Sequence, residues 1–212
     1  MKKFFLAIFD LDGTLIDAYP AIIRSFNFTM RKFNYPARSD AAIRRAVGWG
    51  DENLLKPFVA RRDLKRMLYA YRRHHRESLL QYSGLFAGAK TVLKRLRKKG
   101  YKLAVASNRP TRFSWILIRH LRLREFFDYV LCADKLKFGK PHPQILQRIM
   151  QKLFCLPRET VYIGDMAIDA QAGSRAGIKT IIVTTGSSRR SEIRKENPCR
   201  IIGSIRELLK IL

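Results

Sequence analysis

Short apolar runs rich in β-branched and aromatic residues alternate along the chain with longer stretches of helical periodicity. The short runs predict strands over residues 4–9, 102–106, 129–132, 160–163, 180–183 and 200–202. The longer stretches predict helices over residues 89–99, 113–121, 143–153, 167–176 and 205–212. Gly100 and Gly177 follow two of these helices, as is common at helix ends. This alternation is typical of an α/β fold whose parallel sheet is covered by helices on both faces.

Residues 18–82 interrupt the alternation, because this long interval has helical periodicity and no convincing strand. We interpret the interval as a helical cap that is inserted into the α/β domain. The turn-like segment 83–88, which contains Gly84 and Gly88, returns the chain to that domain. The predicted organisation is a core of residues 1–17 and 83–212 with an inserted cap of residues 18–82.

The chain is strongly basic, with 43 Lys and Arg residues against 17 Asp and Glu residues and a formal net charge of +26 at pH 7. Such a charge attracts polyanions, so contact with nucleic acid is possible. The basic residues nevertheless occur in short clusters along the whole chain, which favours a general basic bias over a dedicated nucleic-acid arm. At 212 residues with 47% hydrophobic residues, the chain can bury a core for one domain and an inserted subdomain.

The cysteine pattern and the first residues indicate the cellular compartment of the protein. Cys132, Cys155 and Cys199 are odd in number, widely separated and without metal-ligand spacing, which favours a reducing cytoplasm. The basic start and the apolar run after it imitate a signal peptide. However, Asp10 and Asp12 interrupt the run early and no small-residue cleavage site follows, so a buried first strand is the better interpretation. No later run has the length of a membrane span, so we expect no membrane partner.

The strongest chemical signal is the segment FDLDGT, residues 9–14, directly after the first predicted strand. Two carboxylates at the end of a buried strand, Asp10 and Asp12, are costly unless a cation pairs with them. Gly13 lets the backbone turn away and approach a ligand closely. Ligands of open α/β sheets bind at this end of the strands. The plainer alternative is a pair of solvated turn carboxylates.

Two further motifs follow predicted strands in the same way. Ser107 and Asn108 come after the strand 102–106, where a hydroxyl and backbone amides bind phosphoryl oxygens without adding charge. The alternative for this pair is a simple turn or helix cap. Lys140 stands between a glycine and a proline before a predicted helix, and a cation there pairs with both a phosphoryl group and a carboxylate. The alternative for Lys140 is an ordinary surface lysine.

A last acidic pair completes the pattern. Asp165 and Asp169 follow the strand 160–163, and their spacing of four residues is one helical turn. Together with Asp10 they predict an acidic, oxygen-rich site for Mg²⁺.

The order of these motifs, DxDGT, Ser-Asn, GKPxP and GDxxxD, resembles the haloacid dehalogenase-like (HAD) hydrolase superfamily. Within it, the chain is similar to the phosphoglycolate phosphatase-like branch, which has a helical cap after the first motif. The resemblance covers essentially the whole length. It implies an α/β fold, with a Rossmann-like parallel-sheet core and an inserted α-helical cap.

The resemblance also implies roles for the acidic residues. Asp10 would be the nucleophile and form an aspartyl-phosphate that water hydrolyses. Asp12 would protonate the leaving alcohol and later deprotonate the water. Mg²⁺ would be held by the Asp10 carboxylate, the Asp12 carbonyl and the Asp165 carboxylate, and Asp169 would orient this site or Lys140.

The phosphoryl group would be bound by a second set of residues under the same resemblance. Lys140 would pair with the phosphoryl oxygens and with the nucleophile. The Ser107 hydroxyl and the backbone amides of Asn108 and Gly13 would donate to the phosphoryl oxygens.

Two departures from the family pattern matter. Met166 replaces the serine that many relatives have in the fourth motif, so we expect altered support of the metal site. Ile22 stands where related phosphomutases have a histidine, which favours a hydrolase.

The expected substrate is a small phosphorylated metabolite, with phosphoglycolate the first to try. Candidate cap residues for binding a second anionic group are Arg44, Arg45, Arg72 and Arg73, but for any one of them a solvated basic helix face is the favoured alternative. Trp49 either covers the substrate or packs within the cap, and we expect the packing. The alternatives are a phosphatase for nucleotides or nucleic-acid ends, and a non-catalytic basic protein that binds nucleic acid on the same fold.

Overall fold

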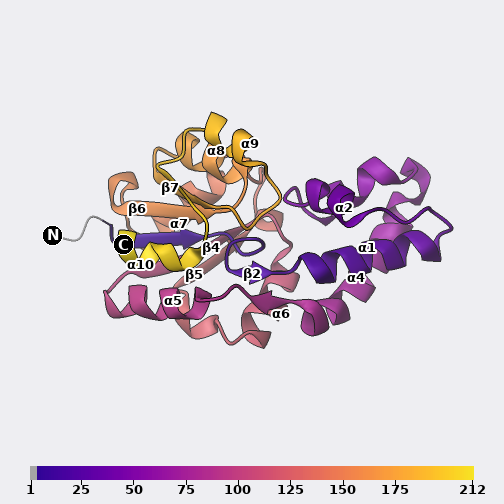
Figure 1. The fold of residues 1–212 in the computed structure, drawn as a ribbon, viewed down its shortest axis with the longest axis horizontal. Helices are drawn as coiled ribbons and strands as arrows, with labels where there is room; N and C mark the ends of the chain where they lie inside the picture. Colours follow the sequence, from indigo (N-terminus) through magenta and orange to yellow (C-terminus); the bar gives the residue numbers. More distant parts are fainter. Residues whose placement is uncertain (1–3) are drawn as a thin grey trace.

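The strands form one central parallel sheet. The computed structural model describes residues 4–212, and within them the sheet has six strands in the order β5-β4-β1-β6-β7-β8 (Figure 1). The strands are β1 (Leu6–Phe9), β4 (Lys102–Ser107), β5 (Tyr129–Cys132), β6 (Thr160–Gly164), β7 (Lys179–Val183) and β8 (Arg200–Ile202). Every predicted strand is confirmed to within two residues at either end. The residues 1–3 of the predicted core lie outside the described part.

Helices cover both faces of the sheet because its strands are apolar on both sides. In β1, Ala7 and Phe9 belong to one core cluster, whereas Leu6 and Ile8 belong to a second. The first cluster includes residues of α5 (Ala89–Lys98), α6 (Thr111–His120) and α10 (Leu208–Ile211). The second includes residues of α7 (Gln144–Leu153) and α8 (Ala167–Arg175). Figure 1 shows these two layers on opposite sides of the strands.

Further short elements lie between the strands or, for η5, after the last of them. They are the helix α9 (Arg190–Lys195) and the 3-10 helices η2 (Arg124–Phe126), η3 (Ala133–Lys135), η4 (Pro157–Glu159) and η5 (Ile205–Glu207). The predicted helix over residues 205–212 is divided, because η5 precedes α10. Its 3-10 turn is capped by the Ser204 hydroxyl, which accepts a hydrogen bond from the amide of Arg206.

The interval between the first motif and the rest of the sheet is helical, as its pattern predicts. It contains α1 (Tyr19–Lys32), α2 (Asp40–Ala46), α3 (Asp51–Leu55), η1 (Lys56–Phe58) and α4 (Arg61–Tyr82). Helix α1 buries Ile22, Phe26 and Met30, one turn apart, against the long helix α4. Figure 1 shows this group beside the carboxyl ends of the central strands.

Two short strands join the helical group to the sheet domain. Strand β2 (Ile16–Asp17) pairs antiparallel with β3 (Gly84–Leu85), so the chain leaves and re-enters the sheet domain at neighbouring positions. These strands were not predicted, since two residues are too few for an alternating pattern.

Candidate active site

The candidate site lies where three neighbouring strands end. Strands β4, β1 and β6 are parallel and adjacent, so Ser107, Asp10 and Asp165 meet at one edge of the sheet. The cavity there has a volume of about 60 Å³, which is enough for a few water-sized groups. The helical group supplies its other wall, with Ile22, Gly48, Gly50, Tyr71 and His75.

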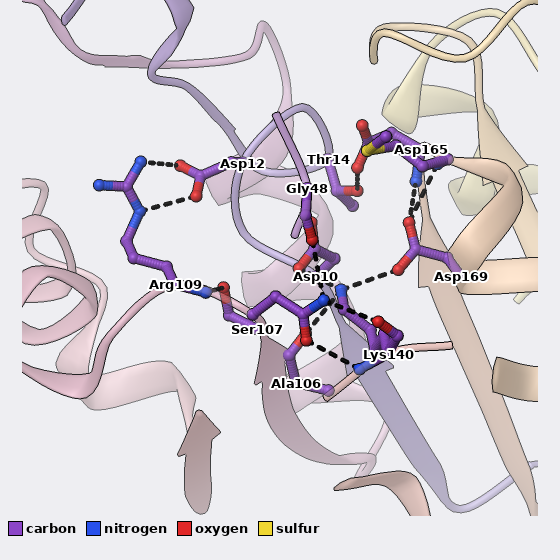
Figure 2. Close-up of polar contacts among 12 residues, drawn as sticks. Asp10, Asp12, Thr14, Gly48, Ala106, Ser107, Arg109, Lys140, Asp165 and Asp169 are labelled. Atoms are coloured by element: carbon purple, nitrogen blue, oxygen red, sulfur yellow. Dashed lines mark hydrogen bonds and ion pairs between the residues drawn. The ribbon is translucent and has the colours of Figure 1, made fainter. Parts of the chain in front are cut away.

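Lys140 is the centre of a buried ionic cluster (Figure 2). Its Nζ donates to Oδ1 of Asp10 at 2.7 Å and to Oδ1 of Asp169 at 2.8 Å. It also donates to the hydroxyl of Tyr162 at 3.0 Å, and this hydroxyl donates in turn to Asp169. Lys140 is only 4% exposed, so the alternative of an ordinary surface lysine is excluded. The arrangement brings a cation against the carboxylate for which the resemblance implies the role of nucleophile.

The carboxyl groups of this cluster outnumber the positive charges that are near enough to neutralise them. Burial raises the pKa of Asp10 to about 7, although the charge of Lys140 opposes the shift. Burial also raises the pKa of Asp165 well above its usual range, and the charges of Asp169 and Asp10 add to this. Burial disfavours the charge of Lys140, but Asp10 and Asp169 outweigh it and raise the lysine pKa. One lysine therefore faces three buried carboxyl groups.

The donor atoms fit a hard divalent cation. Carboxylate oxygens of Asp10, Asp165 and Asp169 lie within 4.8 Å of one another. Oδ1 of Asp165 accepts from the Thr14 hydroxyl at 2.9 Å, whereas its buried Oδ2 has no hydrogen-bond partner among the described residues. Such an unpaired anionic oxygen beside other carboxylates is suited to Mg²⁺.

Asp169 differs from the other two carboxylates because both of its oxygens are already engaged. Oδ1 accepts from Lys140 and Tyr162, and Oδ2 accepts from the amides of Asp165 at 3.2 Å and Met166 at 3.0 Å. Its contacts hold the lysine and the start of the loop after β6 in place. The resemblance implies that Asp169 orients the metal site or Lys140, and the contact with Lys140 is the geometry that the second of these requires.

Mg²⁺ is expected to raise the melting temperature more at about pH 8 than at about pH 5. An acid with a raised pKa is uncharged below that pKa, so Asp10, with a pKa of about 7, is protonated at the lower pH. Only the charged form attracts the cation. Thermal denaturation with and without Mg²⁺ at the two pH values measures the difference.

Two variants make this measurement specific to the cluster. Asp165→Asn is expected to lose the Mg²⁺ effect, because the unpaired oxygen no longer carries charge. Asp134→Asn, which changes an exposed carboxylate, is expected to keep it. An Mg²⁺ effect that survives in Asp165→Asn contradicts the metal assignment.

Asp12 does not join this cluster. Both of its oxygens accept hydrogen bonds from the guanidinium of Arg109, at 2.7 Å from Nε and 2.8 Å from Nη2 (Figure 2). Arg109 is buried and lines the cavity, yet it was not among the predicted site residues. Its position directly after Ser107 and Asn108 is a signal, but among 43 basic residues that signal does not distinguish it.

Ser107 and Asn108 occupy different environments. The Ser107 hydroxyl lies in the cavity wall and accepts a hydrogen bond from the amide of Arg109 at 3.2 Å. The Asn108 side chain donates to the carbonyls of Gly48 at 2.8 Å and Lys140 at 3.0 Å, and accepts from the amide of Lys140. Asn108 thus connects the Lys140 loop to the helical group.

Position 13 requires glycine because its backbone lies very close to the side chain of Asp165. Its φ is +84°, and a Cβ there would collide with the carboxylate of Asp165. Its amide donates to the carbonyl of Ile16 at 2.8 Å. This differs from the predicted hydrogen bond to a phosphoryl oxygen, because the tight turn uses that donor internally.

The predicted cap arginines do not contribute to the cavity. Arg45 pairs with Glu192 at 2.7 Å, and Arg72 pairs with Asp51 at 2.7 Å. The described residues that line the cavity include none of the four candidates, Arg44, Arg45, Arg72 and Arg73. The expectation for Trp49 is wrong, since 47% of this residue is exposed. The arginine of the cavity is Arg109.

Met166 leaves the start of α8 without a side-chain cap of its own. The hydroxyl of Ser188 accepts from the amide of Ala167 at 3.1 Å, so a residue of the loop after β7 supplies an oxygen there. The Met166 sulfur lies 3.7 Å from the Ser187 hydroxyl. Part of the support of the fourth motif therefore comes from this loop.

Comparison with known proteins agrees with the motifs. The model of the haloacid dehalogenase-like hydrolase family matches residues 7–183. A phosphoglycolate phosphatase of Haemophilus influenzae is 30% identical over 99% of this chain and 99% of its own length. Another, of Rhodobacter capsulatus, is 34% identical over 84% of each chain.

A solved structure is similar over the whole length of the chain. The crystal structure of a predicted phosphoglycolate phosphatase from Haemophilus somnus has a TM-score of 0.94 and 26% identity, and covers 100% of this chain and 99% of its own. Sequence, fold and site geometry therefore agree, and the chain belongs to the haloacid dehalogenase-like hydrolases.

Proposed function

We propose that this chain is a Mg²⁺-dependent phosphatase that hydrolyses small phosphate monoesters, with phosphoglycolate as the first substrate to test. The observation that carries the proposal is the Asp10 carboxylate, held by Lys140 at the edge of a small cavity beside an unpaired oxygen of Asp165. The phosphoglycolate phosphatases among its relatives support the choice of substrate.

The first step of the proposed reaction uses Asp10 as nucleophile. One carboxylate oxygen attacks phosphorus and the bond to the leaving oxygen breaks, which gives an aspartyl-phosphate. Lys140 holds the other oxygen and reduces repulsion between two anionic groups. The Ser107 hydroxyl and the Asn108 amide donate to phosphoryl oxygens.

The metal would be held by the carboxylates of Asp10 and Asp165 and by the carbonyl of Asp12. When bound, Mg²⁺ neutralises phosphoryl charge and so favours attack by an anion. Asp169 maintains the position of Lys140 and of the loop that carries Asp165.

Asp12 is the proposed general acid and base. It gives a proton to the leaving alcohol in the first step and takes a proton from water in the second. Water then attacks phosphorus and restores the Asp10 carboxylate. Asp12 performs either transfer only when its oxygens are released from Arg109.

We further propose that residues 18–82 act as a cap on a core of residues 1–17 and 83–212. The adjacent antiparallel strands β2 and β3 provide two neighbouring connections at which the cap can pivot. The hydrogen bond from Asn108 to the Gly48 carbonyl would hold the cap against the core. The small cavity between them supports a small ester and not a polymer as substrate.

We place the protein in the cytoplasm. Cys132, Cys155 and Cys199 are free thiols, as is usual in a reducing compartment. Across residues 4–212, each helix is too short or too polar to cross a membrane.

The experiment that tests the proposal is phosphate release from a panel of esters, with Mg²⁺ or with EDTA. The panel contains phosphoglycolate, sugar phosphates, nucleotides, pyrophosphate and phosphorylated oligonucleotides. Selective release from one small ester, lost in EDTA, is the expected result. Release from oligonucleotides alone contradicts the proposed substrate class, and no release from any ester contradicts the phosphatase.

A further inference from the structure

We propose that Arg109 is the binding residue for a second anionic group of the substrate, and that this group must displace Asp12 from Arg109 before Asp12 can act. This inference rests on the proposed phosphatase function. The substrate that fits such a site is a phosphate monoester with a carboxylate close to the ester oxygen. The juxtaposition behind it is a buried arginine that holds a carboxylate inside the reaction cavity.

The guanidinium is held firmly on one side and presents its binding edge on the other. Nε and Nη2 form the edge that takes both oxygens of Asp12, in the two-bond geometry that suits any carboxylate. Nη1 lies 2.9 Å from Nε2 of His75, which comes from α4 of the helical group. The bound carboxylate of Asp12 therefore shows what kind of ligand this edge accepts.

His75 completes the fixed side of this arrangement. An arginine only donates hydrogen bonds, so Nε2 of His75 must accept and the imidazole proton resides on Nδ1. Nδ1 lies 3.2 Å from the hydroxyl of Ser25. Burial and the charge of Arg109 lower the pKa of His75 well below its usual value, so the ring is neutral. A neutral, buried histidine orients Arg109 without competing for its anion.

The small size of the cavity places Arg109 close to the phosphoryl site. Arg109, Asp10 and Ser107 line the same small cavity, and Arg109 follows Ser107 by two residues. When the phosphoryl group of a substrate is at Asp10, the cavity has room for only a short group beyond the ester oxygen. That group then lies beside Arg109, which is part of the cavity wall. A carboxylate one or two carbons from the ester oxygen meets both conditions.

Replacement of Asp12 by the substrate carboxylate at Arg109 decides whether Asp12 can act in the chemical step. While Arg109 holds both oxygens of Asp12, that carboxyl group is not available to the leaving oxygen. A substrate carboxylate that replaces Asp12 keeps Arg109 paired and frees the acid/base. An ester without this group leaves Asp12 engaged, so it is turned over slowly even when its phosphoryl group is bound. Selectivity is then expressed in kcat as well as in KM.

The test compares phosphoglycolate with 2-hydroxyethyl phosphate, which has a hydroxymethyl group in place of the carboxylate. In the unaltered protein, kcat/KM is expected to be at least about 100-fold higher for phosphoglycolate. Arg109→Met is expected to remove most of this preference, because phosphoglycolate loses its partner while Asp12 is no longer held. Arg109→Lys, which keeps the charge but not the paired bonds, is expected to leave about a tenth of the preference.

The matched control is Arg112→Met, which removes an exposed arginine of α6 outside the cavity and is expected to keep the full preference. Equal losses for the two esters in Arg109→Met and in Arg109→Lys overturn the inference, as does a preference carried by KM alone. Melting temperatures identify variants that fail to fold, and in that case Arg109→Lys decides. Absence of turnover with both esters in the unaltered protein is a different result, because it contradicts the phosphatase itself.

Discussion

Asp10→Asn is expected to lower Mg²⁺-dependent phosphate release by at least about 10⁴-fold, because an amide cannot serve as the nucleophile. The substitution keeps the size of the side chain. Lys140 keeps its hydrogen bonds to Asp169 and Tyr162, so the ionic cluster stays partly paired. A steady-state phosphate assay on the purified variant measures the loss.

Two observations separate loss of the nucleophile from loss of the fold. The melting temperature of Asp10→Asn reports whether the chain is folded. Asp134→Asn, the same exchange at an exposed carboxylate, is expected to retain normal activity. Substantial turnover by folded Asp10→Asn contradicts the assignment of Asp10.

Asp12→Ala is expected to reduce kcat by about 10²–10⁴-fold, which is the usual contribution of a general acid or base. Both half-reactions are affected, because the leaving alcohol is not protonated and the attacking water is not deprotonated. Esters with a good leaving group, such as an aryl phosphate, need less help in the first step and are expected to lose less in it. Pre-steady-state kinetics with both ester types measures the two steps separately.

The outcome that would contradict this role is a change in substrate affinity with kcat preserved. The alanine variant also leaves Arg109 without its carboxylate partner. A decrease in KM for phosphoglycolate in this variant is therefore consistent with the competition between Asp12 and the substrate anion at Arg109.

The sheet was predictable because burial on both faces makes each central strand a continuous apolar run. Strand β1 is buried throughout, and its residues divide between two core clusters. Strands β2 and β3 were not predictable in this way, because they contain only two residues each. Their pairing joins Ile16 to Leu85, 69 positions further along the chain, which no local pattern indicates. The division of the last helix depends on Ser204, which caps a short 3-10 turn.

The acidic part of the site was predictable for a related reason. Asp10 and Asp165 directly follow the neighbouring parallel strands β1 and β6, so sheet geometry brings them together. Lys140 comes from the loop before α7, and its motif was the signal for its place beside Asp10. Arg109 and Tyr162 were missed because their importance comes from burial and from partners far away in the chain. Nothing in local spacing distinguishes a buried arginine from the many exposed ones.

The helical segment of residues 18–82 was the least predictable part. Its helical content follows from periodicity, but the residues that reach the cavity do not. His75 lies in a cluster of basic residues on α4 that reads as a solvated surface, yet it is buried against Arg109. Arg72, from the same helix, is instead bound to Asp51. Which residue of a helix faces a cavity depends on how the helix packs on the core.

Trapping an aspartyl-phosphate is the most direct test of whether phosphate passes through the carboxylate of Asp10. Asp12→Ala is mixed with a radiolabelled aryl phosphate and Mg²⁺, quenched in acid and digested, and the labelled peptide is identified by mass spectrometry. Label is expected on the peptide that contains Asp10, attached to that aspartate, and is expected to be absent when Asp10 is also changed to Asn. Phosphate release without label on that peptide, or label at another residue, would contradict the role of Asp10 as nucleophile.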